Sequence, residues 1–267
     1  WLYTVAEHRL VDEARRRRRR GTRVPLAGGG APVEVGRDVA GAPAAGAHAL
    51  PDFDRTPQLG PRPAAQRPGL LLLTSLPLVF PEEFSLDGGG SPALKALETR
   101  YSVRPIATTD RASLERSPLL LMAHPLAQPA ENLVALDAWV RAGGRVLLLA
   151  DPKLEWPSSR PLGDKLRPPP SFADTGLLAH WGLKLEGPDK AGRAARKITG
   201  RPVAPLSPGN LSGSCRVRRD RLVAHCRPGK GEATVIADVD FLNIERLGED
   251  GRSNLEALLA ELDALER

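Results

Sequence analysis

Six polar residues follow apolar segments at points where strands are expected to end, and their side chains are suited to acid–base or metal chemistry. They are Thr74, Ser75, His124, Asp151, Asp238 and Asp240. In open α/β sheets, ligands bind beyond the carboxyl ends of the strands. Carboxylates with a histidine can hold a divalent ion or act as a general acid and base. His124, Asp151, Asp238 and Asp240 are therefore the candidate ligand-binding residues.

The aspartates also have a purely structural interpretation. An aspartate after a strand commonly caps the next helix or accepts hydrogen bonds from loop amides. Ser75 lacks the flanking glycines of a nucleophile elbow, and Gly88 to Gly90 lack the Lys-Ser/Thr of a phosphate loop. Two cysteines and five scattered histidines give no zinc pattern. The sequence thus predicts no catalytic nucleophile, metal ion or cofactor, and it favours a loop-holding role for Asp151.

The segment 133–152 predicts how such residues are positioned. Leu133, Leu136 and Val140 have helical spacing, and the Gly143-Gly144 pair is typical of a helix end. The following apolar run, VLLLA, suits a strand that is buried on both faces. Helix, turn and buried strand form half of a βαβ unit, with Asp151 at the strand's carboxyl end.

The same alternation extends along residues 69–151 and predicts an α/β fold with a doubly wound, mostly parallel sheet of the flavodoxin-like kind. Ser91 and Asp110 are expected to cap helices, and Pro105 marks its strand as an edge. A further helix is expected to start at Ser171 or Asp174, and a terminal helix at Asn254. The buried strands are expected at 70–74, 119–122, 146–150 and 233–237.

Residues 1–68 differ from the rest of the chain. They contain the run Arg15 to Arg20 and then a Gly-, Pro- and Ala-rich stretch, which predicts a disordered arm or linker before a folded domain at 69–267. A basic segment beside a membrane is an alternative for the arginines. The net charge of +6 depends on that run, and aromatic residues do not alternate with it, so a nucleic-acid partner is not expected.

The two cysteines predict a disulfide. If Asp220 and Arg221 form a two-residue turn, Cys215 lies directly opposite Cys226 in an antiparallel hairpin. Opposed residues in such pairs are close enough for a disulfide bond. Two buried free thiols are the alternative. A disulfide favours an extracytoplasmic location.

Three segments resemble the GldG-like family, an uncharacterised auxiliary component of ABC-type transport systems. They are LDAWVRAGGRVLLLADP at 136–152, TGLLAHWGL at 175–183, and the segment from GKG at 229–231 to DVDFLN at 238–243, followed by Asn254 and a leucine-rich helix. The order and spacing agree with the family over about residues 70–267.

The resemblance implies a sheet like that of class I glutamine-amidotransferase-like domains, without their catalytic cysteine. The cysteine hairpin predicts a β-hairpin insertion in this fold. It also implies a non-catalytic, periplasmic or membrane-associated domain that binds transporter components or a small ligand. A divergent hydrolase using the Asp/His set is the alternative function. The chain shows no apolar run long enough to span a membrane.

Overall fold

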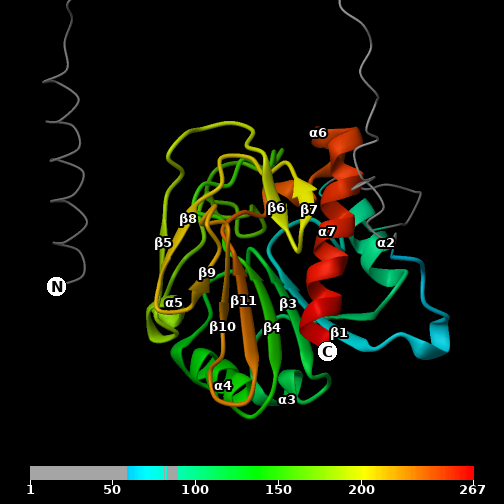
Figure 1. Cartoon of the computed structure of the whole chain (residues 1–267), viewed down its shortest axis with the longest axis vertical. Coiled ribbons are helices and arrows are strands. Elements are labelled where there is room, and N and C mark those ends of the chain that lie inside the picture. The colour runs from blue at the N-terminus through cyan, green and yellow to red at the C-terminus, as the bar shows by residue number, and fades with distance from the viewer. Residues whose placement is uncertain (1–58, 81, 83–89) are drawn as a thin grey trace, which may run out of the picture. The chain divides into compact units, whose positions relative to one another are not determined.

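The computed structural model of the chain describes residues 59–80, 82 and 90–267. This part has a mixed α/β fold around a mostly parallel central sheet, as predicted (Figure 1). The arginine run and most of the predicted arm lie outside the described residues. Among the helices that the structure describes, none has both the length and the hydropathy needed to cross a membrane.

The central sheet contains seven strands among the described residues, in the order β2-β1-β3-β4-β11-β10-β9. Strands β2, β1, β3, β4 and β11 pair in parallel, whereas β10 and β9 are antiparallel additions at one end. The predicted edge strand with Pro105 is the opposite end strand, β2. The bounds are β1 Gly69–Thr74, β2 Ser102–Pro105, β3 Leu119–Ala123, β4 Arg145–Leu149, β9 Arg216–Val217, β10 Val223–Cys226 and β11 Glu232–Ile236.

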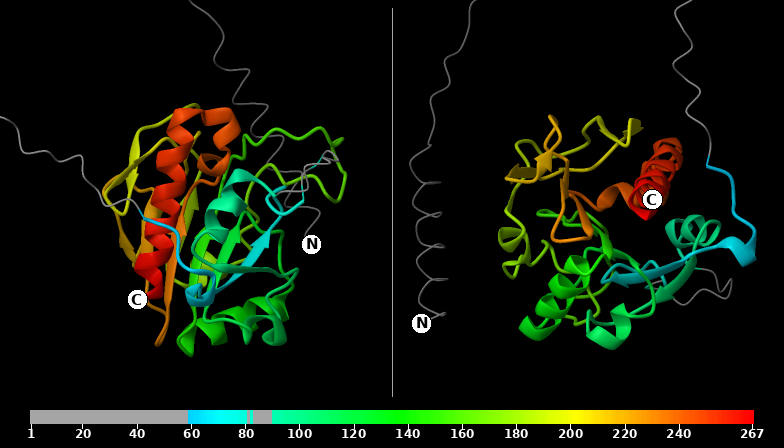
Figure 2. Two further views of the ribbon diagram at one scale, coloured as in Figure 1. Left: turned by 90° about the vertical axis from the view of Figure 1, so that its right-hand side faces the viewer. Right: turned by 60° about the horizontal axis from the view of Figure 1, so that its bottom comes forward.

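Both faces of the sheet are covered, because alternate residues of each strand point to opposite sides. Leu70 and Leu72 pack with α2 and α7 on one face, and Leu71 and Leu73 pack with α3, α4 and α5 on the other. Figure 2 shows these helices on the two sides of the sheet. The helix bounds are η1 Ala64–Gln66, α2 Pro92–Glu98, α3 Arg111–Leu114, α4 Ala130–Arg141, α5 Leu177–His180, η2 Asp240–Leu242, α6 Ile244–Leu247 and α7 Glu249–Glu266.

The segment 133–152 forms the predicted helix, turn and buried strand, namely α4, the glycine pair and β4. Gly143 has φ +123°, a conformation that residues with a Cβ rarely adopt. A Cβ on Gly144 would lie 2.4 Å from the Trp139 ring. Each glycine is therefore required where it stands.

Two helix predictions need correction. The terminal helix begins at Glu249, and Asn254 lies inside it, where its side chain donates to the Phe241 carbonyl and accepts from Ala204 N. The helix expected from Ser171 or Asp174 is reduced to the single turn of α5. Gly176 at its start has φ +101°, which prevents the helix from extending backwards.

Two small antiparallel sheets complete the described part. β5 (Leu183–Glu186) pairs with β8 (Asn210–Gly213), and β6 (Arg196–Ile198) forms a hairpin with β7 (Arg201–Val203). The β6–β7 hairpin packs against α7, because Ile198 and Val203 belong to the same core as Leu258 and Leu262.

The cysteine hairpin confirms the predicted disulfide. His225 pairs with Arg216 in β10 and β9, so the next pair in the ladder is Cys226 with Cys215. The two are bonded, with their Cα atoms 4.9 Å apart. The hairpin continues the central sheet and is not a separate insertion as predicted, because β10 pairs with β11.

Reduction of this disulfide is expected to raise the intact mass by two hydrogens. It is also expected to lower the free energy of unfolding by about 2–4 kcal/mol, since the open chain gains conformational freedom in the unfolded state. Intact-mass spectrometry and urea denaturation, each with and without reductant, measure the two effects. An unchanged mass would contradict the bond.

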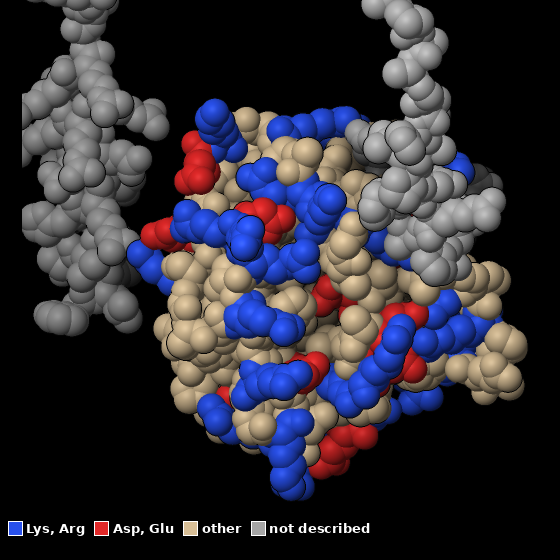
Figure 3. Space-filling view, viewed as in Figure 1, with Lys and Arg blue, Asp and Glu red and all other residues tan. Residues whose placement is uncertain are grey.

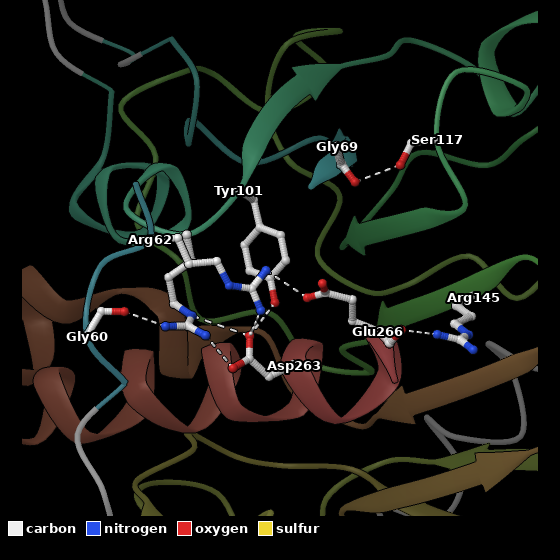
Figure 4. A network of polar contacts seen from close by, with 9 residues as sticks. Gly60, Arg62, Gly69, Tyr101, Ser117, Arg145, Asp263 and Glu266 are labelled. Carbon is white, nitrogen blue, oxygen red and sulfur yellow. Dashed lines mark hydrogen bonds and ion pairs between the residues drawn. The ribbon is translucent and has the colours of Figure 1, made fainter. Parts of the chain in front are cut away.

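The packed part of the chain begins before the predicted boundary at residue 69. Asp263 on α7 accepts hydrogen bonds from Arg100 at 2.5 Å, from Arg62 at 3.2 Å and from the Tyr101 hydroxyl at 2.7 Å (Figure 4). Arg62 also pairs with Glu266 at 2.9 Å. Residues preceding β1 are thus fastened to the last helix.

Candidate functional site

Three predicted site residues lie together where β4 and β11 end. These strands are parallel neighbours, with Leu149 opposite Ile236, so the residues that follow them meet at one edge of the sheet. Asp151 and Asp238 are 0% exposed and Asp240 is 2% exposed. Three carboxyl groups in so little water are costly unless they are neutral or hydrogen-bonded.

Asp151 and Asp238 hold loops in place. Asp151 accepts hydrogen bonds from Lys153 N at 2.8 Å and from Val239 N at 3.0 Å. Asp238 accepts from Phe241 N at 3.0 Å and from Leu206 N at 3.1 Å. Their oxygens therefore satisfy backbone amides from the loops after β4, β7 and β11, which agrees with the structural interpretation of Asp151.

Asp240 differs from the other two. One of its oxygens, Oδ2, accepts from Glu155 N at 2.7 Å. The other, Oδ1, is buried and has no hydrogen-bond partner among the described residues. A buried polar atom without a partner costs free energy, so its presence needs an explanation.

The cluster has unusual acidity. Burial raises the pKa of Asp240 to about 7, helped by the charge of Asp151, and burial raises the pKa of Asp151 to about 6. The pKa of Asp238 is raised well above its ordinary value by burial and then by the charge of Asp151. Proximity of like charges and loss of water both favour the protonated forms.

His124 does not join the carboxyl groups. It follows β3, and its Nε2 lies 2.9 Å from the Pro169 carbonyl oxygen, while Nδ1 is buried without a partner among the described residues. Burial lowers the pKa of His124, and the Pro169 hydrogen bond opposes this shift. Its φ of 49° is uncommon for a residue with a side chain. We assign it to the packing of the loop after β3.

Thr74 and Ser75 also serve the backbone. The Thr74 hydroxyl donates to the Ala123 carbonyl at 2.8 Å, and the Ser75 hydroxyl donates to the His124 carbonyl at 2.5 Å. Both residues line a cavity of about 670 Å³ beyond the carboxyl end of β1, whose other walls include Ile106 and Leu166. Neither hydroxyl has a histidine side chain as a general base.

Sequence reasoning missed Glu155 and Ser207. The Ser207 hydroxyl donates a short hydrogen bond to Glu155 and accepts from Gly192 N at 2.8 Å. The hydrogen bond from Ser207 holds the pKa of Glu155 below its ordinary value, and a hydrogen bond from Lys153 acts in the same direction. No local motif marks either residue, because they are distant in sequence and meet only in the fold.

The arrangement suits proton transfer better than metal binding. Asp240 has a raised pKa and the adjacent Glu155 a lowered one, and such a divergence is typical of acid–base pairs. In the part of the chain described by the structure, no group of three or more His, Cys, Asp or Glu residues has a geometry that could hold a metal ion.

No protein-family model matches the chain, and no curated protein matches it. Among solved structures, it is similar to an exo-β-1,4-mannosidase from an Opitutaceae bacterium, with 14% identity, a TM-score of 0.48, and coverage of 74% of this chain and 36% of that one. A β-galactosidase from Bacillus circulans sp. alkalophilus has 8% identity, a TM-score of 0.44, and coverage of 74% and 31%. A cytoplasmic protein from Salmonella typhimurium has 10% identity, a TM-score of 0.45, and coverage of 74% and 98%.

These comparisons correct the predicted function. The sequence predicted a non-catalytic auxiliary domain of an ABC-type transport system, whereas the mannosidase and the galactosidase are enzymes. The matched structures give no support to the predicted non-enzymatic transport domain, and the alternative of a hydrolase agrees better with them. The chain spans about a third of each glycosidase, 36% and 31%, and the TM-scores are below 0.5, so no substrate is transferred from them.

Proposed function

We propose that this protein is a hydrolase that uses Asp240 as a general acid and Glu155 as a general base at the carboxyl edge of the sheet. The observation that carries the proposal is the unpartnered Oδ1 of Asp240, on a carboxyl group with a pKa of about 7 beside a carboxylate of lowered pKa. General acid–base catalysis works best with groups that titrate near the working pH.

The two carboxyl groups have separate tasks in this proposal. Asp240 is about half protonated near neutral pH and gives its proton to the oxygen of the leaving group. Glu155 is ionised and removes a proton from the attacking water. Its side chain is 24% exposed, so water reaches it directly.

Asp240 lies beneath the loop that carries Glu155. Because Asp240 is only 2% exposed, the substrate reaches it only when this loop moves. Glu155 is held by Ser207 and by an ion pair with Arg246 at 3.7 Å, contacts that bridge the loop to the segments after β7 and β11. The proposal thus includes an opening step before chemistry.

Replacing Asp240 with asparagine is expected to lower turnover about a hundredfold or more, because the proton donor is lost. The assay is a panel of p-nitrophenyl esters, phosphates and glycosides, measured from pH 5 to pH 9. The wild-type rate is expected to fall as the pH rises through about 7, where Asp240 loses its proton.

Glu155→Gln is the second test variant, and Asp164→Asn, in the same loop, is the matched control that should keep wild-type rates. Equal rates for Asp240→Asn and Asp164→Asn would overturn the assignment of the acid. The absence of turnover on every class of the panel would count against hydrolysis itself.

We further propose the doubly wound, flavodoxin-like or glutamine-amidotransferase-like class for the sheet. Its support is the strand order β2-β1-β3-β4-β11 together with helices on both faces. The finer class is supported by the placement of the helices on both sides of the sheet, with α2 and α7 on one face and α3, α4 and α5 on the other.

We also propose that the α/β domain is related to the GldG-like family, on the basis of the three similar sequence segments. It is supported by their positions, since the segments correspond to α4 with β4, to α5, and to β11 with η2. An extracytoplasmic location is proposed as well, supported by the disulfide between Cys215 and Cys226. A protein or small-molecule partner remains a prediction.

A further inference from the structure

Two cavities meet on the face of the hairpin β9–β10 that is turned towards α7. One, of about 620 Å³, lies between these strands and the last turns of α7, and the other, of about 720 Å³, lies beside β9 and the β6–β7 hairpin. Arg216 and His225 line both of them. We call the combined hollow the basic groove, because its walls carry Arg196, Lys197, Arg216, Arg218, Arg219 and Arg227.

We propose that the basic groove binds an extended acidic peptide segment of a partner protein. The proposal does not depend on the proposed hydrolase, since the groove shares no residue with the pair Asp240 and Glu155. Figure 3 shows Lys and Arg side chains spread over the face of the molecule that carries this hairpin.

Arg227 pairs with Glu232 at 3.1 Å, but other basic side chains of the groove are available to a partner. Lys197, Arg216 and Arg218 have no ion pair within the described part of the chain. His225 is held by Thr234 Oγ1 at 3.1 Å and faces Glu261 at 3.6 Å. Its pKa is lowered first by burial and then by the charges of Arg216 and Arg218, which Glu261 and Glu232 oppose. Basic residues outnumber acidic ones on the walls of both cavities, so the groove has a positive field.

The backbone beside the groove is suited to an extended segment. β9 is the last strand in the sheet order, so its outer side has no strand partner among the described residues. The consecutive residues from Arg216 to Asp220 all line the second cavity, which therefore follows β9 into the turn after it. A peptide laid there can add main-chain hydrogen bonds, and its side chains alternate with the same period as Arg216 and Arg218.

The shape and composition of the groove favour a peptide over other anions. A membrane surface is flat, whereas this surface is hollowed. Single-stranded nucleic acid is commonly bound by aromatic side chains that stack on bases, and neither cavity is lined by Phe, Tyr or Trp. Asp220, Glu232 and Glu261 lie among the basic residues, and they would repel a continuous phosphate chain while leaving room for spaced carboxylates.

Protection against aggregation is the other reason for basic residues on an edge strand. It accounts for Arg216 and Arg218 on β9. It does not account for Arg196 and Lys197, which come from the separate β6–β7 hairpin and line the same cavity. Basic side chains from β9 and from the β6–β7 hairpin therefore meet in one cavity, as expected of a binding surface.

The test uses the full chain and a fluorescent octapeptide of alternating Glu and Ser, followed by anisotropy at about 0.15 M ionic strength. The paired variant Arg216→Glu/Arg218→Glu is compared with Lys95→Glu/Arg104→Glu, which makes the same charge change at exposed positions on α2 and on the opposite edge strand β2. Both pairs retain Arg15 to Arg20, so any contribution of that run cancels between them.

The groove pair is expected to weaken binding about tenfold or more, and the control pair by less than about threefold, since like charges replace attractive ones only in the groove. Two other probes are a thymidine octanucleotide and vesicles of phosphatidylglycerol and phosphatidylcholine. The proposal is overturned if the groove variant and the control variant weaken peptide binding equally. It is also overturned if an uncharged Gln-Ser octapeptide binds as tightly as the Glu-Ser octapeptide. Tighter groove-dependent binding of the oligonucleotide or the vesicles overturns the choice of a peptide.

Discussion

Replacing Asp263 with alanine is expected to lower the free energy of unfolding by about 3–5 kcal/mol, because it leaves the buried Arg100 guanidinium without its counterion. Asp263 receives hydrogen bonds from Arg100 at 2.5 Å and from Tyr101 at 2.7 Å, and the side chains of Arg100 and Asp263 are 9% and 7% exposed. The same change removes one of the two α7 carboxylates that hold Arg62, with Glu266 as the other, so the segment before β1 is held less firmly (Figure 4). Urea denaturation measures the loss.

Glu115→Ala is the control for this measurement. Glu115 pairs with Arg111 at 2.7 Å on the surface, where the side chains are 60% and 88% exposed, and water replaces the lost contact. No measurable change is expected. If the two variants were equally stable, Asp263 would not be an anchor of the fold.

Replacing Asp240 with asparagine is expected to stabilise the protein at alkaline pH. Burial raises the pKa of Asp240 to about 7, so above that pH the folded protein must hold a buried charge that the unfolded chain exposes to water. A group whose pKa is higher in the folded state contributes its full stability below the unfolded pKa of about 4 and loses it as pH rises through about 7. The gain at pH 8 is roughly 2–4 kcal/mol.

The measurement is the urea midpoint of the wild type and of Asp240→Asn between pH 4 and pH 8. The gap between the two proteins is expected to widen as the pH rises, because only the wild type loses a proton from residue 240 on the way. A gap that is constant with pH would show that Asp240 has an ordinary pKa. Such a result would also remove the physical basis for Asp240 as a general acid.

These expectations connect the site to the stability of the fold. A buried carboxyl group that ionises is a cost that asparagine avoids, because its amide stays uncharged, and active sites commonly retain such costs. A variant that is more stable and less active would fit the proposed role of Asp240. If the variant is more stable and fully active, Asp240 has no part in catalysis.

Much of the sheet was predictable from local patterns. The unbroken apolar runs that became β1, β3, β4 and β11 could be buried only between two layers, so they predicted a mostly parallel sheet. Ser91 and Asp110 cap α2 and α3 as expected, since each accepts a hydrogen bond from the third residue after it. The register that places Cys215 opposite Cys226 was predicted correctly, although the turn lies at Arg219 and Asp220 and not at Asp220 and Arg221.

The errors arose where long-range contacts decide the structure. Asn254 has the residue type of a helix cap, yet it lies inside α7 because its amide bridges Phe241 and Ala204, which are far from it in sequence. The start of the packed region was misplaced because Arg62 is fastened by α7 and not by its own neighbours. Local composition does not show such a partner.

The sequence by itself determined which segments are buried strands, where the glycine turn between α4 and β4 lies, and that aspartates follow two of those strands. Those features depend on residue type and on short spacings. Tertiary structure alone decided that His124, at the same edge, bonds the Pro169 carbonyl and not a carboxyl group, and that Glu155 joins the buried aspartates. The physical reason is that burial and neighbouring charges set the acidity of a carboxyl group, and both come from segments that meet only when the chain is folded.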